Sequence, residues 1–378
     1  MSTHHFKKTV EELIAPGDIR INGSRDWDIQ VHNERFYSRV LSDGSLGLGE
    51  SYMDGWWDCE HLDQCIERML LLDLDKKVQS WRAVAAGLLA RVVNAQAGRR
   101  AFIIGERHYD TGNDLFERML DKRMTYTCGY WSASAQGSGA MTLDKAQEAK
   151  LDLVCRKIGL KKGDHVLDIG CGWGSFLIYA VKKYGVRGTG LTVSKEQAAL
   201  ARERAKGLPI EIHIQDYRAT SGSFDTVVSL GMFEHVGAKN HRVFFEVVRR
   251  VLKDDGLFLL HTIGGSTSET VGDPWFEKYI FPNSLVPSVG QVALASEGLF
   301  VMEDWHNFSA HYDLTLMKWY ANVERAWPEL SQKYSETFHR MWRFYLLSSA
   351  GLFRARKGQL WQIVFSKNGV KGGYTRVV

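Results

Sequence analysis

The sequence predicts an α/β fold: a parallel sheet with helices on both faces and a helical insert, preceded by a small N-terminal domain. Three observations support this prediction. The chain has 378 residues, more than one ordinary domain. Strand-like and helical segments alternate from residue 165 to residue 305. The first of these strands runs directly into a glycine-rich turn at residues 170–174, where a helix begins.

Composition excludes several classes of protein. The five cysteines are an odd number with no C-x-x-C spacing, so neither a disulfide framework nor a zinc site is expected, and a reducing cytosol fits. No apolar run reaches the length of a membrane span, and the first eight residues lack an apolar signal segment. The net charge of +4 mildly favours an anionic surface. We expect no metal and no nucleic-acid partner.

Residues 1–90 are predicted to form the N-terminal domain. A short helix is expected around Val10–Ile14 and a strand around Asp28–His32. The segment Gly44–Glu60 looks too rich in glycine for a helix, and it is either a packed turn or a contact surface. From Lys76 to Asn94, apolar residues recur at helical spacing beside Lys76, Lys77, Arg82 and Arg91. Such a basic amphipathic helix either lies on an anionic membrane or covers the core of its own domain.

Residues 91–378 are predicted to form the larger domain. Two loops dense in polar and aromatic residues, 108–116 and 124–131, precede a helix at 142–158. The first strand, His165–Ile169, carries Asp168, and the turn after it places Gly170, Gly172 and Gly174 in a D-x-G-x-G-x-G pattern. A dinucleotide fingerprint would need glycine at position 175, where serine stands. The pattern instead resembles the first motif of class I S-adenosylmethionine (SAM) methyltransferases.

The remaining elements follow in order. Further strands are expected at 188–193, 210–215, 226–232, 257–263 and 300–305. A long aromatic helical insert follows Tyr312, and a last strand at 359–366 is expected to close the sheet. In such a fold, ligands bind at the carboxyl ends of the strands.

Polar residues at those strand ends are the candidate site. No acid follows the second strand to hold a ribose, but Thr192 and Gln197 can donate and accept hydrogen bonds there. Asp216 follows the third strand, where it can accept from an adenine amino group. Glu234, His235 and His261 follow the next two strands and are therefore expected to meet near a reacting group.

These segments together resemble the cyclopropane-fatty-acyl-phospholipid synthase family, in its full-length bacterial form. The resemblance rests on seven segments: 47–57, 108–116, 126–131, 166–174, 232–237, 261–264 and 304–316. It implies that SAM is held by Tyr126, Thr127, Asp168, Gly170, Gly172, Gly174, Thr192, Gln197, Gln215 and Asp216. It also implies a bound bicarbonate base, held by the backbone of Cys128 and Ile263 and by the side chains of Glu234, His261 and Tyr312. One departure is His311, where the family commonly has an acid.

The resemblance implies an enzyme that converts cis double bonds of phospholipid acyl chains into cyclopropanes. The chemistry of the candidate residues agrees, because methyl transfer to an alkene leaves a carbocation that aromatic faces stabilise and a base must deprotonate. Two alternatives stay open: a methyltransferase that gives a methyl-branched lipid or acts on nitrogen or oxygen, and a non-catalytic protein that binds SAM or lipid. A cytoplasmic homodimer, peripherally bound to membrane phospholipids, is the expected state.

Overall fold

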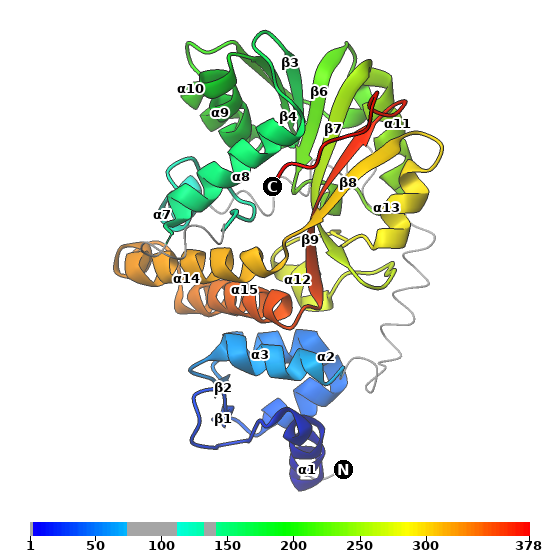
Figure 1. Cartoon of the computed structure of the whole chain (residues 1–378). Coiled ribbons are helices and arrows are strands. Elements are labelled where there is room, and N and C mark those ends of the chain that lie inside the picture. The colour runs from blue at the N-terminus through cyan, green and yellow to red at the C-terminus, as the bar shows by residue number, and fades with distance from the viewer. Residues whose placement is uncertain (1–2, 74–111, 132–140) are drawn as a thin grey trace. The chain divides into compact units, whose positions relative to one another are not determined.

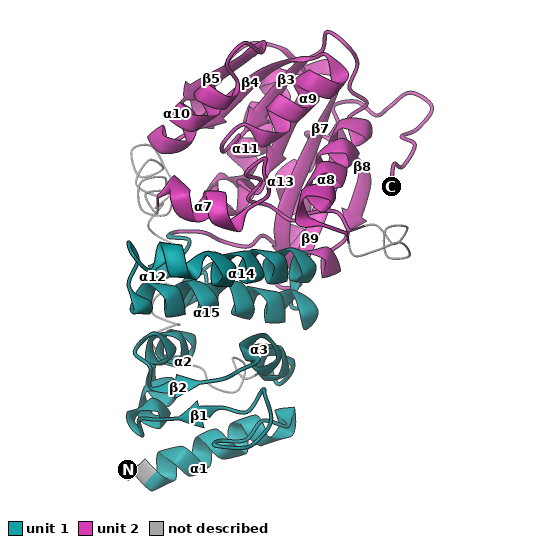
Figure 2. Ribbon diagram, turned by 90° about the vertical axis from the view of Figure 1, so that its left-hand side faces the viewer, with its two compact units in different colours: residues 1–93, 270–282, 312–358 teal, residues 94–269, 283–311, 359–378 magenta. Residues whose placement is uncertain are grey.

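A computed structural model of the chain describes residues 3–73, 112–131 and 141–378. The described residues fold into two compact units (Figure 2). The first unit comprises residues 1–93, 270–282 and 312–358, and the second comprises residues 94–269, 283–311 and 359–378. The predicted boundary at residue 90 and the basic helix from Lys76 to Asn94 lie outside the described residues, so the predicted domains 1–90 and 91–378 stay a prediction.

The second unit is built on a seven-stranded sheet of order β5-β4-β3-β6-β7-β9-β8 (Figure 1). Neighbouring strands from β5 to β7 pair in parallel, whereas β8 and β9 pair antiparallel. The strands are β3 (His165–Ile169), β4 (Arg187–Thr192), β5 (Ile210–Ile214), β6 (Phe224–Leu230), β7 (Leu252–Gly265), β8 (Val301–Asn307) and β9 (Gly358–Ser366).

The predicted strands are therefore present, but the expectation that the last one closes the sheet is wrong. β9 inserts between β7 and β8, and β8 forms the edge. Hydrophobic pattern identifies a buried strand without specifying its neighbours. β9 is buried at all but one of its nine positions, as expected for an interior strand of a sheet that is covered on both faces.

Helices cover both faces of the sheet. Two hydrophobic clusters form, one on each side: Leu167 and Ile169 of β3 belong to one with Phe258, and Val166 belongs to the other with Phe176. This alternation along one strand is what a sheet buried on both faces requires. The helices of this unit are α7 (Asn113–Met119), α8 (Leu143–Lys157), α9 (Ser175–Tyr184), α10 (Lys195–Arg204), α11 (His241–Val251) and α13 (Val289–Ser296).

The first unit is mainly helical. Its two short strands, β1 (Gln30–Val31) and β2 (Trp57–Asp58), pair antiparallel. Its helices are α1 (Thr3–Ile14), α2 (Arg35–Met53), α3 (Leu62–Leu71), α12 (Pro274–Tyr279), α15 (Glu336–Arg354) and the part of α14 (Ala310–Leu330) from residue 312 onward. The helical insert predicted after Tyr312 is thus present as α14 and α15. None of the helices in the described ranges combines the length and the hydrophobicity that a membrane span requires.

The glycine-rich segment that begins at Gly44 is a correction to the sequence analysis. It is helical up to Met53, within α2, and only Gly44 departs from helical geometry, at φ +58°. Gly49 faces the ring of Trp275, and a Cβ atom there would lie 2.3 Å from that ring. The glycines therefore permit close packing in this unit, which favours the packed interpretation of the segment over a contact surface.

Candidate active site

The turn after β3 gives the site its shape. Gly170, Gly172 and Gly174 all have positive φ angles, of +89°, +53° and +78°. A Cβ atom at Gly170 would lie 2.5 Å from the Met232 side chain, so only glycine fits there. A Cβ atom at Gly172 would meet nothing within 4 Å. The turn thus brings backbone to the edge of an open space at the carboxyl end of the sheet.

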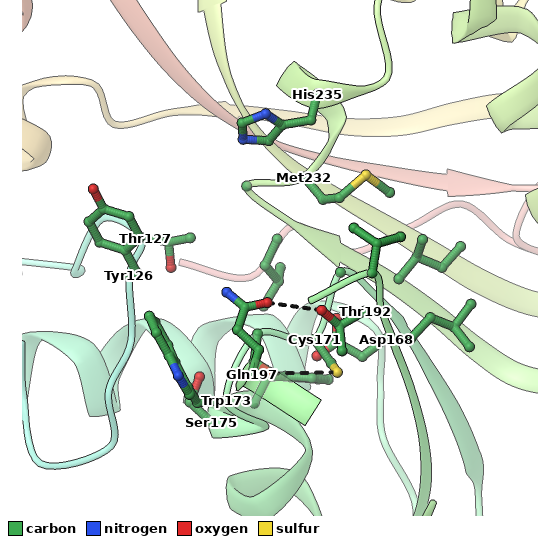
Figure 3. Close-up of a pocket in the computed structure, with 18 of the residues that line it drawn as sticks. Tyr126, Thr127, Asp168, Cys171, Trp173, Ser175, Thr192, Gln197, Met232 and His235 are labelled. Atoms are coloured by element: carbon green, nitrogen blue, oxygen red, sulfur yellow. Dashed lines mark hydrogen bonds between the residues drawn. The ribbon is translucent and has the colours of Figure 1, made fainter. Parts of the chain in front are cut away.

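That space is a cavity lined by the turn, by the ends of β4 and β6 and by the loop 124–127 (Figure 3). Nine of the ten predicted cofactor residues line it: Tyr126, Thr127, Asp168, Gly170, Gly172, Thr192, Gln197, Gln215 and Asp216. The tenth, Gly174, does not line the cavity. It is the N-cap of α9, and its left-handed backbone conformation allows the chain to turn there. The structure therefore gathers at one cavity residues that lie up to 90 positions apart in the sequence.

Asp168 is the buried acid of the cavity. Its side chain is 2% exposed, and Oδ1 has no hydrogen-bond partner among the described residues. Burial raises the pKa of Asp168 to about 7, and the nearby Lys150 ammonium opposes that rise. A buried carboxylate oxygen without a partner suits a cationic donor such as an α-ammonium group.

Several polar side chains predicted for the site have protein partners. Thr192 Oγ1 donates to Gln197 Oε1 at 2.9 Å, which leaves the Gln197 amide group as a donor (Figure 3). Gln215 Nε2 donates to Thr220 Oγ1 at 3.3 Å. Asp216 accepts from the backbone N–H and the guanidinium of Arg218, at 2.9 Å and 2.7 Å. Asp216 therefore caps the following turn, and its remaining lone pairs are those available to a ligand.

An aromatic wall borders the turn. The Phe116 ring lies between Tyr126 and Trp173, with centroids 5.1 Å and 5.0 Å away. Trp173 Nε1 donates to Asn113 Oδ1 at 3.1 Å, and this bond fixes the indole against α7. Such faces suit a sulfonium or a developing carbocation. The rest of the loop 108–116, from His108 to Thr111, lies outside the described residues.

Lys150 is a cavity residue that the sequence analysis missed. It is fully buried on α8, and its Nζ donates to Thr127 Oγ1 at 2.7 Å. Burial lowers the pKa of Lys150 to about 8, against the attraction of Asp121, Cys128 and Asp168. The sequence contains a pattern that could have identified Lys150. Helical spacing places both lysines on the apolar face of the helix, in the series Ala146, Lys150, Leu153 and Lys157.

Glu234 and Ile263 meet directly at the ends of β6 and β7. The Ile263 N–H donates to Glu234 Oε1 at 2.7 Å, while Glu234 Oε2 is buried without a hydrogen-bond partner among the described residues. Burial raises the pKa of Glu234 to about 7. A carboxyl group with this pKa is readily protonated, so its second oxygen can donate to a small anion as well as accept from it.

The other predicted catalytic residues are all buried. His261 Nδ1 lies 3.3 Å from Gln362 Nε2, and burial together with Lys150 and Lys157 holds the pKa of His261 well below its ordinary value. Cys128 follows Thr127 in the loop beside the cavity, fully buried, with its Sγ 3.1 Å from the Gly129 carbonyl. Tyr312 belongs to the first unit, where its ring packs on Phe353 at 4.5 Å.

Two further histidines have defined positions. His235 lines the cavity, and burial lowers its pKa to about 4. His311, the departure from the resembled family, accepts the Trp131 N–H on Nδ1 at 3.1 Å. An acidic side chain could accept from a backbone N–H in the same way, so here an uncharged imidazole serves as that acceptor.

Sequence comparisons identify related proteins. The family model for mycolic acid cyclopropane synthetase matches residues 96–363. A cyclopropane-fatty-acyl-phospholipid synthase of Escherichia coli (strain K12) is 51% identical over 370 residues, which are 98% of this chain and 95% of the relative. A probable fatty acid methyltransferase of Pseudomonas putida is 35% identical over 274 residues, 69% of this chain and 68% of the relative.

Solved structures resemble the chain as well. A cyclopropane synthase from Mycobacterium tuberculosis has a TM-score of 0.66 at 30% identity, and the match covers 72% of this chain and 100% of that one. A mycolic acid cyclopropane synthase complexed with SAH and CTAB has a TM-score of 0.64 at 30% identity, covering 70% of this chain and 98% of the other.

Proposed function

The chain belongs to the mycolic acid cyclopropane synthetase family, and we propose that it transfers a methylene group from SAM to the cis double bonds of unsaturated phospholipid acyl chains. Its second unit has the class I SAM-methyltransferase fold. The observation that carries the proposal is the arrangement at the carboxyl end of the sheet. The open cavity at Gly172 and the Asp168 oxygen, which has no partner among the described residues, lie in the same unit as the buried Glu234 carboxyl. The product is a cyclopropane fatty acyl chain.

The cavity supports SAM as the co-substrate. Asp168 has a buried acceptor for the ammonium group, Gly172 leaves room for the ligand beside the backbone, and Gln197 retains a donor for a hydroxyl or ring nitrogen. The roles of these residues and of Tyr126, Thr127, Gln215 and Asp216 rest on their place around the cavity and on the family resemblance. SAM supplies the methyl group that is transferred to the alkene.

An isolated alkene is a weak nucleophile, so the reaction depends on alignment and on exclusion of water. The alkene attacks the methyl carbon of SAM, the bond from sulfur to methyl breaks, and the sulfonium leaves as a neutral thioether. The methyl group is then bonded to one alkene carbon and the adjacent carbon is cationic. Ring closure then requires that a proton leave the new methyl group as its carbon bonds to the cation. Aromatic faces around the cavity, including those of Tyr126 and Trp173, suit a positive charge.

We propose bicarbonate as the base that accepts this proton. The residues present fit a small oxyanion, because Glu234 has a buried oxygen without a partner in the described ranges and a pKa of about 7. A proton can therefore lie between the two anionic groups. Ile263 already donates its N–H to Glu234 and would have to share it with the anion. Cys128, His261 and Tyr312 are assigned to this anion by the family resemblance.

A second candidate activity is formation of a methyl-branched lipid, in which the cation loses a proton from a different carbon. This alternative is supported by the similarity to the Pseudomonas putida relative, which is described as a probable fatty acid methyltransferase. A protein that only binds SAM or lipid would not need the buried Glu234 carboxyl beside the site. Methyl transfer to nitrogen or oxygen is disfavoured, because the aromatic faces of Tyr126 and Trp173 at the cavity suit an apolar substrate.

Peripheral attachment to an anionic membrane and assembly as a homodimer complete the proposal. The net charge of +4 and the absence of a spanning helix among the described residues are compatible with attachment at the surface. The substrate's acyl chains lie within a bilayer, so the enzyme has to reach that surface. Sedimentation equilibrium would test the dimer.

The experiment that tests the activity is incubation of the protein with SAM and vesicles of unsaturated phospholipid, followed by mass spectrometry of the lipids. The expected product is heavier by one methylene, has lost its double bond and resists catalytic hydrogenation under conditions that reduce alkenes. Saturated vesicles should give no product. A product that retains an alkene would identify the branched-chain alternative.

A further inference from the structure

Lys150 combines three features that together are unusual for a lysine that only packs. Its side chain is fully buried and lines the cavity, and among the described residues its Nζ has one hydrogen bond, to Thr127 Oγ1 at 2.7 Å. An ammonium group has three donors, so two remain. Burying a charge is unfavourable unless partners satisfy it, and Asp168, which attracts the ammonium from the same cavity, has an oxygen without a partner in the part of the chain that the structure describes.

An α-amino acid carries its ammonium and its carboxylate on one carbon. A pocket that recognises both groups therefore needs an anion and a cation close together. Asp168 and Lys150 are such a pair: both are buried, both line the cavity, and each attracts the other electrostatically. Asp168 suits the ammonium of SAM, which leaves the SAM carboxylate to be received.

We propose that Lys150 receives the carboxylate of SAM, with the Thr127 hydroxyl held beside it as a second donor, and so selects for the complete amino-acid end of the cofactor. This inference rests on the proposed function, because it assumes that SAM occupies the cavity. The hydrogen bond from Lys150 makes Thr127 Oγ1 an acceptor, so the Thr127 proton remains free to point toward the anion.

Decarboxylated SAM is the probe, because it differs from SAM only by the missing carboxylate. The affinities of both ligands are measured by calorimetry on the full chain, for the wild type and for Lys150→Gln. The wild type should bind SAM more tightly than the decarboxylated ligand. Lys150→Gln should lose roughly ten- to hundredfold in SAM affinity, the range for a charge-assisted hydrogen bond, and should bind decarboxylated SAM as well as the wild type does.

Two control variants lie on the same helix. Lys157→Gln removes an equally buried lysine that contacts His306 Nδ1 at 2.9 Å and does not line the cavity. It should leave the ratio of the two affinities unchanged. Gln147→Met removes the donor to the Thr127 carbonyl, at 2.6 Å, and so loosens the same loop without changing charge. It should weaken both ligands by the same factor.

The outcomes separate the possibilities. Equal weakening of both ligands by Lys150→Gln, as expected for Gln147→Met, would mean that Lys150 only holds the loop, and it would overturn the inference. Equal affinity of the wild type for the two ligands would overturn it without any variant, should Lys150→Gln not fold. Failure of the wild type to bind SAM at all would overturn the proposed function itself, and the inference with it.

Discussion

The buried carboxyl of Glu234 accepts the backbone N–H of Ile263 at 2.7 Å, across the ends of two adjacent parallel strands. One oxygen is thereby fixed, and the other is buried without a partner among the described residues. The bond orients the carboxyl group, so its free oxygen has a defined direction. A group held in this way suits the positioning of a small anion better than the binding of a flexible substrate.

Glu234→Gln should therefore preserve SAM binding and lower turnover by about a hundredfold or more, the range for loss of acid–base function. The amide keeps the shape of the side chain but cannot exchange a proton with the anion. Calorimetry and lipid mass spectrometry measure the two effects. Wild-type turnover should also fall in buffer depleted of carbon dioxide and return with added bicarbonate. Normal turnover of the variant, with no response to bicarbonate, would assign the base to a side chain such as His261 or Tyr312.

The same carboxyl group predicts how stability depends on pH. Its pKa is about 7 in the folded protein and has its ordinary value near 4.5 in the unfolded chain. The folded state thus binds the extra proton between these values, and its stability falls as pH rises through that window, by up to about 3 kcal/mol. Glu234→Gln should remove this loss, so its urea midpoint relative to wild type should be higher at pH 8 than at pH 4. Asp168→Asn should act in the same direction. Parallel midpoints at both pH values would contradict the prediction.

Gly172→Asp should abolish detectable SAM binding in a folded protein. The new side chain would enter the cavity from a position with nothing within 4 Å and place an anion beside the backbone that the cofactor has to approach. Gly159→Asp is the matched control: its φ of +59° is close to the +53° of Gly172, and it also has nothing within 4 Å, but it does not line the cavity. The control should show a similar loss of stability and normal binding. If Gly172→Asp bound SAM with wild-type affinity, SAM would not bind at this turn.

Gly351→Ala should destabilise the first unit by about 1–3 kcal/mol, because a Cβ atom there would lie 2.7 Å from the Asp63 carbonyl oxygen of α3. The helices α15 and α3 would have to move apart. Thermal unfolding measures the effect. Gly290→Ala is the control within α13, where the nearest atoms lie 3.8 Å away, so the same substitution should be neutral or stabilise by up to about 1 kcal/mol. Equal effects of the two variants would show that α15 and α3 tolerate the methyl group.

Attachment to membranes is predicted from the sequence alone, since Lys76, Lys77 and Arg82 lie outside the described residues. Changing these three residues to Gln should weaken sedimentation with anionic vesicles, by about 1 kcal/mol per charge at most, and salt should screen the difference. Neutral vesicles are the comparison. If sedimentation at low salt were unchanged, these three residues would not contact the membrane. The segment would then pack within the protein, and another segment would attach the protein to the membrane.

The sequence by itself determined the local elements and the chemistry at their ends. Glycines in alternate positions after a buried strand specify a turn that few other residues can form, and that strand's Asp168 marks the ligand side. The parallel strands and the insert after Tyr312 could also be predicted, because hydrophobic periodicity indicates which positions are buried. The residues predicted to hold SAM gather at one cavity for this reason, apart from Gly174, which shapes the turn.

Only the tertiary structure decided what depends on contacts between distant segments. The place of β9 between β7 and β8 is a matter of pairing, which composition does not encode. The segment around Gly49 is helical despite its glycines, and Gly49 leaves the space that the Trp275 ring, distant in sequence, occupies. Likewise, whether a lysine on an apolar helix face is solvated or buried against Thr127 depends on how the chain folds over it. Burial sets the charge of such groups, so the electrostatics of the site belong to the fold.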